Sequence, residues 1–155
     1  MNTDRKDVAS NRKAFHEYFI LERYEAGIEL AGTEVKSIRA GNINLKDSFC
    51  TVKDGELFLH GMHISPYSHG NIFNKDPVRS RRLLMHKKEI SRLHARIMTD
   101  GVTLIPLCVY FKGSLIKIEL GLCKGKKLHD KRDSAAERES KRDMERILKE
   151  RRSME

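Results

Sequence analysis

The residues best suited to chemistry are seven histidines and a glycine- and lysine-rich segment near the C-terminus. His60 and His63 are three positions apart in a segment that favours a strand, so their side chains are expected on opposite faces, where they cannot share a metal. Segment 121–127, GLCKGKK, resembles a phosphate-binding loop, but its glycine spacing differs and Lys127 replaces the magnesium-binding Ser or Thr. Neither pattern predicts a metal or a cofactor.

The adjacent residues His129 and Asp130 have the types of a general base and its orienting acid. Adjacent residues on a helix diverge, however, and no nucleophile lies nearby in the sequence. We therefore predict that the protein is not an enzyme. If the protein were an enzyme, the alternative hypothesis would be an RNA-processing enzyme centred on His129.

The overall charge indicates a polyanionic partner. Lys and Arg number 31 against 22 Asp and Glu, for a formal net charge of +9, which suits nucleic acid or an anionic membrane. The most apolar run, 102–111, is too short to span a bilayer, and residues 1–10 contain no apolar stretch typical of a signal peptide. We therefore expect a nucleic-acid partner, no membrane and a cytoplasmic location. Cys50, Cys108 and Cys123 are widely spaced and are expected to be small buried hydrophobic residues.

Two groups of cations could follow RNA phosphates. The first occupies a predicted helical region and comprises Arg79, Arg81, Arg82, Lys87, Lys88, Arg92 and Arg96. The second would extend this basic surface and comprises Arg12, Lys13, Lys36 and Arg39. Tyr18 and Tyr24 could stack on unpaired bases, but aromatic residues are only 6% of the chain. This composition favours recognition of folded RNA by backbone and shape.

These side chains are positioned by elements organised around 27–49. A short helix is predicted there, with Thr33 as N-cap, Glu34 in the first turn and Gly41 at the C-terminal end. Lys36 and Arg39 share one face, whereas Val35 and Ile38 can pack inward. Two interpretations fit this pattern: a connecting helix with solvated charges, or a part of the basic surface.

Alternating residue types predict a long strand over 18–30 that is bent midway. Asp54-Gly55 predicts a hairpin between 49–53 and 56–64, and a second hairpin is predicted between 102–111 and 115–122. After a loop over 65–74, Asp76-Pro77 predicts the start of a helical region that ends at Gly101. His86 is an alternative N-cap that would divide this region in two.

Five or six short, mostly antiparallel strands predict a mainly β fold with flanking helices, namely a small oligonucleotide-binding-like β-barrel with about three short helices. Residues 1–10 are expected to be a frayed, flexible N-terminus, and 11–123 to form the RNA-binding barrel domain. Residues 124–155 are rich in both charges and form a predicted basic tail. Because Met144, Ile147 and Leu148 lie on one helical stripe, we predict a tail that is disordered when free and helical when bound.

Five blocks of sequence, found in the family's order, closely resemble the SsrA-binding protein family, also called small protein B: NRKAFHEYFI, YEAGIELAGTEVKSIRAG, LKDSF, DPVRSRRLLMHKKEI and GKKLHDKR. The resemblance runs from about residue 11 to the C-terminus. It implies an oligonucleotide-binding-like barrel, not an enzyme, that binds the tRNA-like domain of transfer-messenger RNA. It further implies delivery of this RNA to bacterial ribosomes stalled without a sense codon, in trans-translation. We expect a monomer when free.

The resemblance also implies site residues. Glu25 and Leu84 match positions needed for the RNA complex, with Asn11, Arg12 and Tyr18 beside them; a carboxylate such as Glu25 can accept hydrogen bonds from base amines or ribose hydroxyls. Other matching residues would enter the decoding region of the small ribosomal subunit or seat the tail in the empty mRNA channel: Gly125, Lys126, Lys127, His129, Asp130, Lys131, Arg132, Ile147 and Leu148. Ser140 departs from the family, where many relatives carry an aromatic residue, so tail anchoring here could depend more on the apolar stripe. A ribosome-embedded structural protein with a basic tail fits the composition nearly as well.

Overall fold

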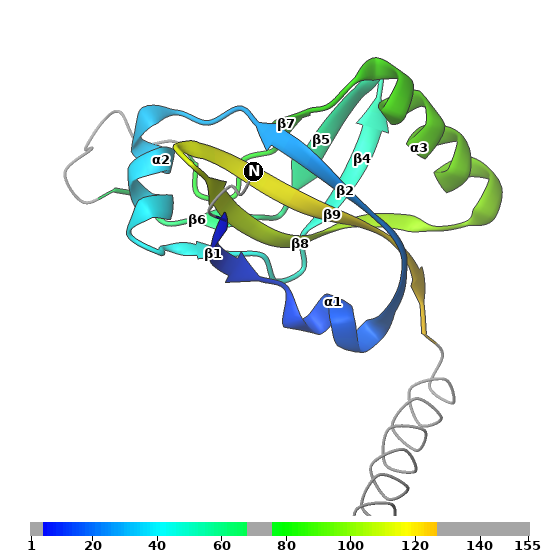
Figure 1. Ribbon diagram of the computed structural model, residues 1–155, viewed down its shortest axis with the longest axis horizontal. Coiled ribbons are helices and arrows are strands. Elements are labelled where there is room, and N and C mark those ends of the chain that lie inside the picture. The colour runs from blue at the N-terminus through cyan, green and yellow to red at the C-terminus, as the bar shows by residue number, and fades with distance from the viewer. Residues whose placement is uncertain (1–4, 68–75, 127–155) are drawn as a thin grey trace, which may run out of the picture. The chain divides into compact units, whose positions relative to one another are not determined.

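The protein is described by a computed structural model that covers residues 5–67 and 76–126 (Figure 1). The chain divides into two units, Met1–Lys124 and Gly125–Glu155, and all but the first two residues of the second unit lie outside the described residues. The elements, in chain order, are β1 (Arg5–Ser10), α1 (Arg12–Glu17), β2 (Tyr18–Ile28), α2 (Gly32–Arg39), β3 (Ile43–Asn44), β4 (Phe49–Lys53), β5 (Glu56–His60), β6 (His63–Ile64), β7 (Arg81–Leu84), α3 (Lys87–Asp100), β8 (Thr103–Lys112) and β9 (Leu115–Gly125).

The strands of the first unit close into an antiparallel barrel. Their hydrogen-bonded order is β1-β8-β4-β5-β7-β2-β9, and β8 also pairs with β9. The ring therefore runs from β8 through β4, β5, β7, β2 and β9 back to β8, so closure leaves few strand edges exposed. The helix α3 contacts β5 beside the barrel (Figure 1). The predicted mainly β, oligonucleotide-binding-like fold with three helices is confirmed in the part of the chain that the structure describes.

The first strand corrects the expectation of a frayed N-terminus. Residues 5–10 form β1, which pairs with β8 from Arg5 opposite Lys112 to Ser10 opposite Cys108. The same edge of β8 pairs with β4 only at Leu104, so its later residues are open to a further strand. Val8 and Ala9 also pack against the core. Sequence reasoning missed β1 because its partner lies about 100 residues away in the chain.

The helix α1 was also not predicted. Asn11 is its N-cap: its Oδ1 accepts a hydrogen bond from the backbone N–H of Ala14 at 3.2 Å. Its Nδ2 donates to the carbonyl of Pro106 on β8 at 2.9 Å, so one buried amide fastens the helix to the barrel. The strand predicted after it is confirmed as β2.

The helical region predicted from Asp76-Pro77 to Gly101 is wrong in its first part, and the start of a separate helix after His86 is confirmed. Residues 81–84 form β7, and α3 begins after its N-cap His86 and ends at Gly101, whose φ of 64° is left-handed. Leu83 fits a helical period, but it also alternates with Leu84 across a strand that pairs with β5 and β2. Asp76 instead accepts a hydrogen bond from the backbone of Val78 at 3.0 Å in a turn.

Both predicted hairpins are confirmed. Asp54 and Gly55 have φ angles of 53° and 75°, which are typical of a two-residue type I′ turn between β4 and β5. The second strand ends at His60 rather than at residue 64, since Gly61 turns the chain with a φ of 80°. A Cβ at Gly61 would lie 3.0 Å from the carbonyl oxygen of Asp47, so the close approach also requires glycine.

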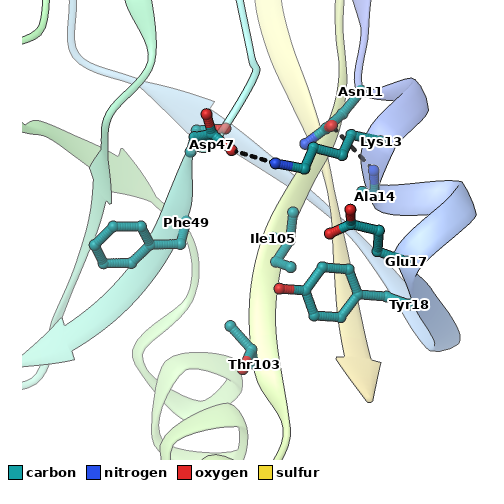
Figure 2. A pocket seen from close by; sticks show the side chains of 10 residues that line it. Asn11, Lys13, Ala14, Glu17, Tyr18, Asp47, Phe49, Thr103 and Ile105 are labelled. Carbon is teal, nitrogen blue, oxygen red and sulfur yellow. Dashed lines mark hydrogen bonds and ion pairs between the residues drawn. The ribbon is translucent and has the colours of Figure 1, made fainter. Parts of the chain in front are cut away.

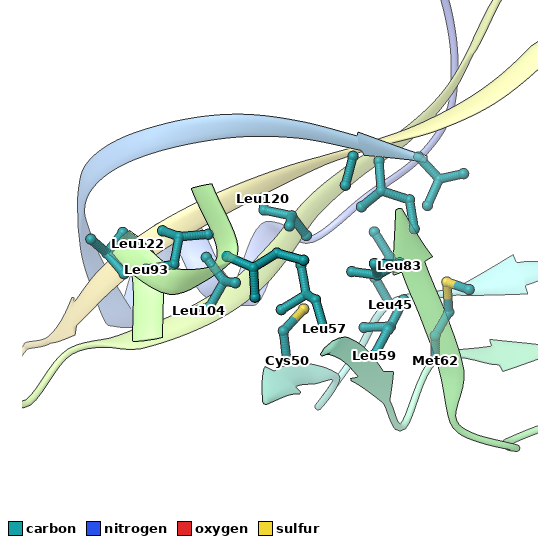
Figure 3. Close-up of a cluster of buried hydrophobic side chains, with 14 of the residues drawn as sticks. Leu45, Cys50, Leu57, Leu59, Met62, Leu83, Leu93, Leu104, Leu120 and Leu122 are labelled. Carbon is teal, nitrogen blue, oxygen red and sulfur yellow. The ribbon is translucent and has the colours of Figure 1, made fainter. Parts of the chain in front are cut away.

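The core lies inside the barrel, and leucine is its most frequent residue (Figure 3). Its fully buried side chains come from facing strands and include Leu57, Leu59, Leu83, Leu104, Leu120 and Leu122. A smaller cluster under α1 contains Ala14, Ile105, Leu107 and Cys123. All three cysteines are free and buried, as predicted.

Candidate nucleic-acid interface

The helix α2 begins two residues earlier than predicted. Its N-cap is Ala31, not Thr33, and the carboxylate of Glu34 accepts the backbone N–H of Ala31 at 2.9 Å. Gly41 follows the C-cap Ala40 with a φ of 80°. This arrangement buries Glu34 and Ile38 and leaves Lys36 and Arg39 exposed on the outer face.

The buried carboxylate of Glu34 binds two arginines that precede and begin β7. Arg81 donates from Nε at 2.7 Å, and Arg79 donates from Nε at 3.1 Å. Burial disfavours the ionised carboxylate, but the hydrogen bonds from Arg79, the backbone of Ala31 and Arg81 outweigh it and lower the pKa of Glu34. Glu34 is therefore a structural anion and does not face an RNA ligand.

The arginines predicted to follow phosphates divide by accessibility. Arg81 is fully buried and also donates to the carbonyls of Met62 and Pro77, so its guanidinium is not exposed to a phosphate. This corrects the expectation that Arg81 belongs to the basic surface, because it lies in β7 with its side chain inward. Arg82 points outward and bridges Glu56 at 2.8 Å and Glu29 at 3.1 Å. Arg79 is partly exposed.

Glu25 and Leu84, which come from separate sequence blocks, line one hollow of about 340 Å³, together with His86, Glu89 and Lys117. An adjoining hollow of about 280 Å³ is more apolar and is lined by Gly27, Leu84, Leu115, Ile116 and Lys117, among others. We call the two together the Leu84 groove, because Gly27, Leu84 and Lys117 line both.

Strand pairing explains why these residues meet. Gly27 on β2 lies opposite Leu84 on β7, and a Cβ at Gly27 would lie only 3.3 Å from Leu84 Cβ. Because Gly27 has no side chain to cover it, Leu84 lies at the surface with 44% of its area exposed. An exposed leucine beside a carboxylate and a lysine is suited to a ligand with an apolar face and polar edges, such as a nucleotide.

Two side chains of β8 hold the carboxylate of Glu25. The hydroxyl of Tyr110 donates to its Oε2, and Nζ of Lys112 lies 3.3 Å from its Oε1. The Tyr110 hydroxyl lowers the pKa of Glu25, partial burial opposes this, and Lys112 adds to the lowering. Glu25 is therefore an ionised acceptor in the Leu84 groove at neutral pH.

A third hollow, of about 310 Å³, is lined by other predicted residues (Figure 2). Asn11, Lys13 and Tyr18 line one part of it, and Asp47 and Phe49 line another. Lys13 pairs with Asp47 at 2.8 Å across the hollow.

The exposed ring of Phe49 was not singled out from the sequence, although 44% of its area faces solvent. Its centroid lies 5.2 Å from that of His60, and the two ring nitrogens of His60 each lie 2.7 Å from a hydroxyl, that of Thr51 and that of Ser80. The position of Phe49, outward at the start of a strand, was the only available signal.

The structure thus places most of the predicted RNA-binding residues at the Leu84 groove, at the hollow beside α1 and on the helices α1 and α2, whereas Arg79, Arg81 and Arg82 lie before and within β7. Asn11 is buried and caps α1, whereas Arg12 and Lys13 are exposed on that helix and Tyr18 is half-buried. Gly125 ends β9 and Lys126 follows it. The remaining predicted ribosome-facing residues lie outside the described residues: Lys127, His129, Asp130, Lys131, Arg132, Ile147 and Leu148.

Within residues 5–67 and 76–126, no group of three or more His, Cys, Asp or Glu side chains has the arrangement of a metal site. In the same ranges, no helix combines the length and the apolar character that crossing a bilayer requires.

Comparisons with known proteins give one consistent result. The family model described as "SmpB protein" matches residues 8–150. An "SsrA-binding protein" of Acetivibrio thermocellus is 59% identical over 95% of this chain and 96% of its own length, and one of Clostridium perfringens is 56% identical over 96% and 95%. A solved structure described as "tmRNA-SmpB: a journey to the center of the bacterial ribosome" contains a similar chain, with a TM-score of 0.67 and 47% identity over 82% of this chain and 93% of that one.

Proposed function

Because this chain belongs to the SmpB family, we propose that it binds the tRNA-like domain of transfer-messenger RNA and delivers this RNA to stalled ribosomes for trans-translation. The name of the relatives, SsrA-binding protein, and the solved tmRNA-SmpB structure support this proposal. The role involves no catalytic step and no cofactor. Its place is the bacterial cytoplasm, and the free protein acts as a monomer.

The observation that carries the proposal is the meeting of Glu25 and Leu84 in one groove, from strands β2 and β7. In this proposal, the ionised carboxylate of Glu25 accepts hydrogen bonds from base amines or ribose hydroxyls of the RNA. Leu84 packs against a base or sugar face, and Lys117, which also lines the groove, neutralises a nearby phosphate.

The exposed cations of α1 and α2 supply contacts to the backbone of the RNA. Arg12, Lys13, Lys36 and Arg39 are exposed and can each neutralise a phosphate. Lys13, Arg79 and Arg82 contribute less, since each is paired with a carboxylate. Tyr18 offers a ring edge at the hollow beside α1, and Asn11 supports this surface by holding the helix.

The C-terminal part of the proposal concerns residues outside the described ones. Residues 125–132 enter the decoding region of the small ribosomal subunit, and Ile147 and Leu148 help to seat the tail in an mRNA channel that contains no messenger. A charged segment with few apolar residues is suited to order only on binding, so occupancy of the channel is sensed by competition for space. In this proposal the barrel together with β1, residues 5–123, forms the RNA-binding domain, and residues 124–155 form the tail.

A gel-shift titration tests the RNA-binding step. The protein should bind transfer-messenger RNA with a nanomolar-range dissociation constant and prefer it over ordinary tRNA. Leu84→Asp should weaken this binding about tenfold or more, because it places a charge in the groove against RNA. Met98→Asp is the matched control, since Met98 is an exposed apolar residue on α3 away from the groove and should bind as the wild type does. Equal affinity for both RNAs would refute the proposal.

A deletion tests whether the barrel binds the RNA and the tail acts separately on the ribosome. Removal of residues 126–155 should leave binding of transfer-messenger RNA nearly intact and abolish peptide tagging on stalled ribosomes. Replacement of both Ile147 and Leu148 by Asp in the full chain should impair tagging. The reason is the loss of about 1.5–3 kcal/mol of burial free energy for each side chain. Joint loss of RNA binding and tagging on deletion would assign the tail to the RNA site instead.

A further inference from the structure

A chain of side-chain contacts crosses the outer face of four neighbouring strands and ends at Glu25. The strands lie in the order β1, β8, β9 and β2 through successive pairings. Tyr110 on β8 is 2% exposed, and its hydroxyl donates to Glu25 on β2. On the other side, Cζ of Arg5 on β1 lies 3.9 Å from the centroid of the Tyr110 ring. The ring of Tyr110 is therefore held between the N-terminal strand and the Leu84 groove.

The strand β9, which lies between β8 and β2, reinforces this arrangement. Glu119 on β9 accepts a hydrogen bond from Arg5 at 3.0 Å and another from Arg23 at 2.9 Å. Arg5 is thus fixed above Tyr110 by an acid as well as by the ring, which favours one position of its guanidinium. These contacts tie β1 to β2 across the two strands between them.

We propose that Tyr110 is a positioning residue for RNA binding, which holds the Glu25 carboxylate aimed into the Leu84 groove, and that Arg5 holds the Tyr110 ring in place. This inference rests on the proposed function. A carboxylate on a flexible side chain must otherwise lose rotamer freedom when RNA binds, and an oriented one has already lost it. A tyrosine hydroxyl suits the task because it donates one hydrogen bond and leaves other lone pairs of the carboxylate for the ligand.

The remaining charged groups around Glu25 do not replace Tyr110. Nζ of Lys112 lies 3.3 Å from Oε1 and 3.4 Å from Oε2 of Glu25, and Lys117, His86 and Glu89 line the same hollow. The cations favour an ionised Glu25 without fixing its orientation, because an ammonium group acts as a compact charge. Burial and the bond to Glu25 raise the pKa of Tyr110, so its hydroxyl stays protonated as a donor throughout the neutral range.

The test is Tyr110→Phe, which removes the hydroxyl and keeps the ring under Arg5. In the free protein, a carboxyl-carbon NMR titration should show the pKa of Glu25 rising toward its ordinary value. The affinity for transfer-messenger RNA should fall about 3- to 10-fold, the range expected when one side chain must be ordered on binding. Tyr24→Phe is the matched control, since it removes a hydroxyl that donates to Glu22, which does not line the groove, and it should leave affinity unchanged.

A double-mutant cycle separates positioning from a merely structural role. In a Glu25→Gln background, Tyr110→Phe should cause no further loss of affinity, because Tyr110 acts through the carboxylate that is already absent. An equal loss in both backgrounds, an unchanged pKa of Glu25, or wild-type affinity of Glu25→Gln itself would each overturn the inference. Failure of the proposed function would differ, since the wild-type protein would then show no preference for transfer-messenger RNA while the NMR titration still reports the Tyr110 contact.

Discussion

Arg81 donates a hydrogen bond from Nε to Oε2 of Glu34 at 2.7 Å, and both side chains are almost fully buried. The pair joins α2 to the start of β7. Because β7 also carries Leu84, the pair helps to fix the position of Leu84 in the groove. A charged pair inside a barrel is costly to bury, but breaking it by removing one partner costs more.

Replacement of Glu34 by Gln should therefore destabilise the fold. The change leaves the guanidinium of Arg81 buried without a counter-charge, and the free energy of unfolding should fall by about 3–5 kcal/mol. Chemical denaturation followed by circular dichroism measures this loss. Glu29→Gln is the control: Glu29 is an exposed partner of Arg82, and its replacement should cost at most about 1 kcal/mol. Equal effects of the two variants would contradict a structural role for the buried pair.

The same pair predicts how stability depends on pH. The pKa of Glu34 lies below its ordinary value of 4.5 in the folded protein, so folding favours the ionised form. Its contribution is complete above pH 4.5 and is lost as the pH falls from there through the folded-state pKa. The stability difference between the wild type and Glu34→Gln should thus shrink on acidification below that value. A difference that stays constant down to about pH 2, well below the ordinary carboxyl pKa, would contradict this.

Substitutions at two glycines distinguish the energetic cost of backbone strain from the cost of steric crowding. Gly61 and Gly113 both have left-handed φ angles, of 80° and 63°, but a Cβ would be crowded only at Gly61, by the carbonyl of Asp47. Gly61→Ala should lower the free energy of unfolding by about 2–4 kcal/mol and Gly113→Ala by about 1–2 kcal/mol. Thermal unfolding of both variants measures the difference, which should vanish if the turn after β5 can open without cost.

The buried thiols should be nearly inert in the native protein. Burial raises the pKa of Cys123 to about 11 and also raises the pKa values of Cys50 and Cys108. Because the thiolate is the reactive form, labelling by a disulfide reagent at pH 8 should be about 100-fold slower than for a free thiol. A Ser91→Cys variant, at an exposed position of α3, should gain one rapidly labelled group. Rapid labelling of all three native cysteines would indicate that the barrel opens readily.

The salt dependence of RNA binding reports phosphate contacts one at a time. Arg39→Gln on α2 should reduce the slope of log affinity against log salt by about 1 and weaken binding to different RNAs alike. Lys53→Gln, an exposed cation at the end of β4 outside the proposed interface, should leave the slope unchanged. Filter binding at several salt concentrations measures both slopes. An unchanged slope for Arg39→Gln would remove α2 from the interface.

Local signals were sufficient for the parts of the fold that depend on neighbours in the chain. Asp54-Gly55 determines a hairpin by its own backbone preferences, and Ile116, Ile118, Leu120 and Leu122 alternate along the sequence of β9. The elements that depend on distant partners could not be predicted in this way. The helix α1 is fastened by Asn11 to a carbonyl 95 residues away, and β1 exists only because β8 has an open edge.

The candidate site shows the same limit. Glu25 and Leu84 were identified by resemblance, and Leu84 was expected on a helix, but only the pairing of β2 with β7 places both at one groove. Tyr110 and Lys117 carried no sequence signal, because each looks like an ordinary strand residue. The sequence alone groups Arg81 with the surface cations, since a run of two arginines does not reveal which one faces inward until the strand register is known.

The pairing of β1 with the later half of β8 has a practical consequence for truncated versions of this protein. A version shortened to begin at Asn11 would lack the strand that covers this edge and would leave a row of backbone amide and carbonyl groups unpaired. Such an edge can bind the same strand of a second molecule, so the shortened protein should self-associate at concentrations at which the full chain does not.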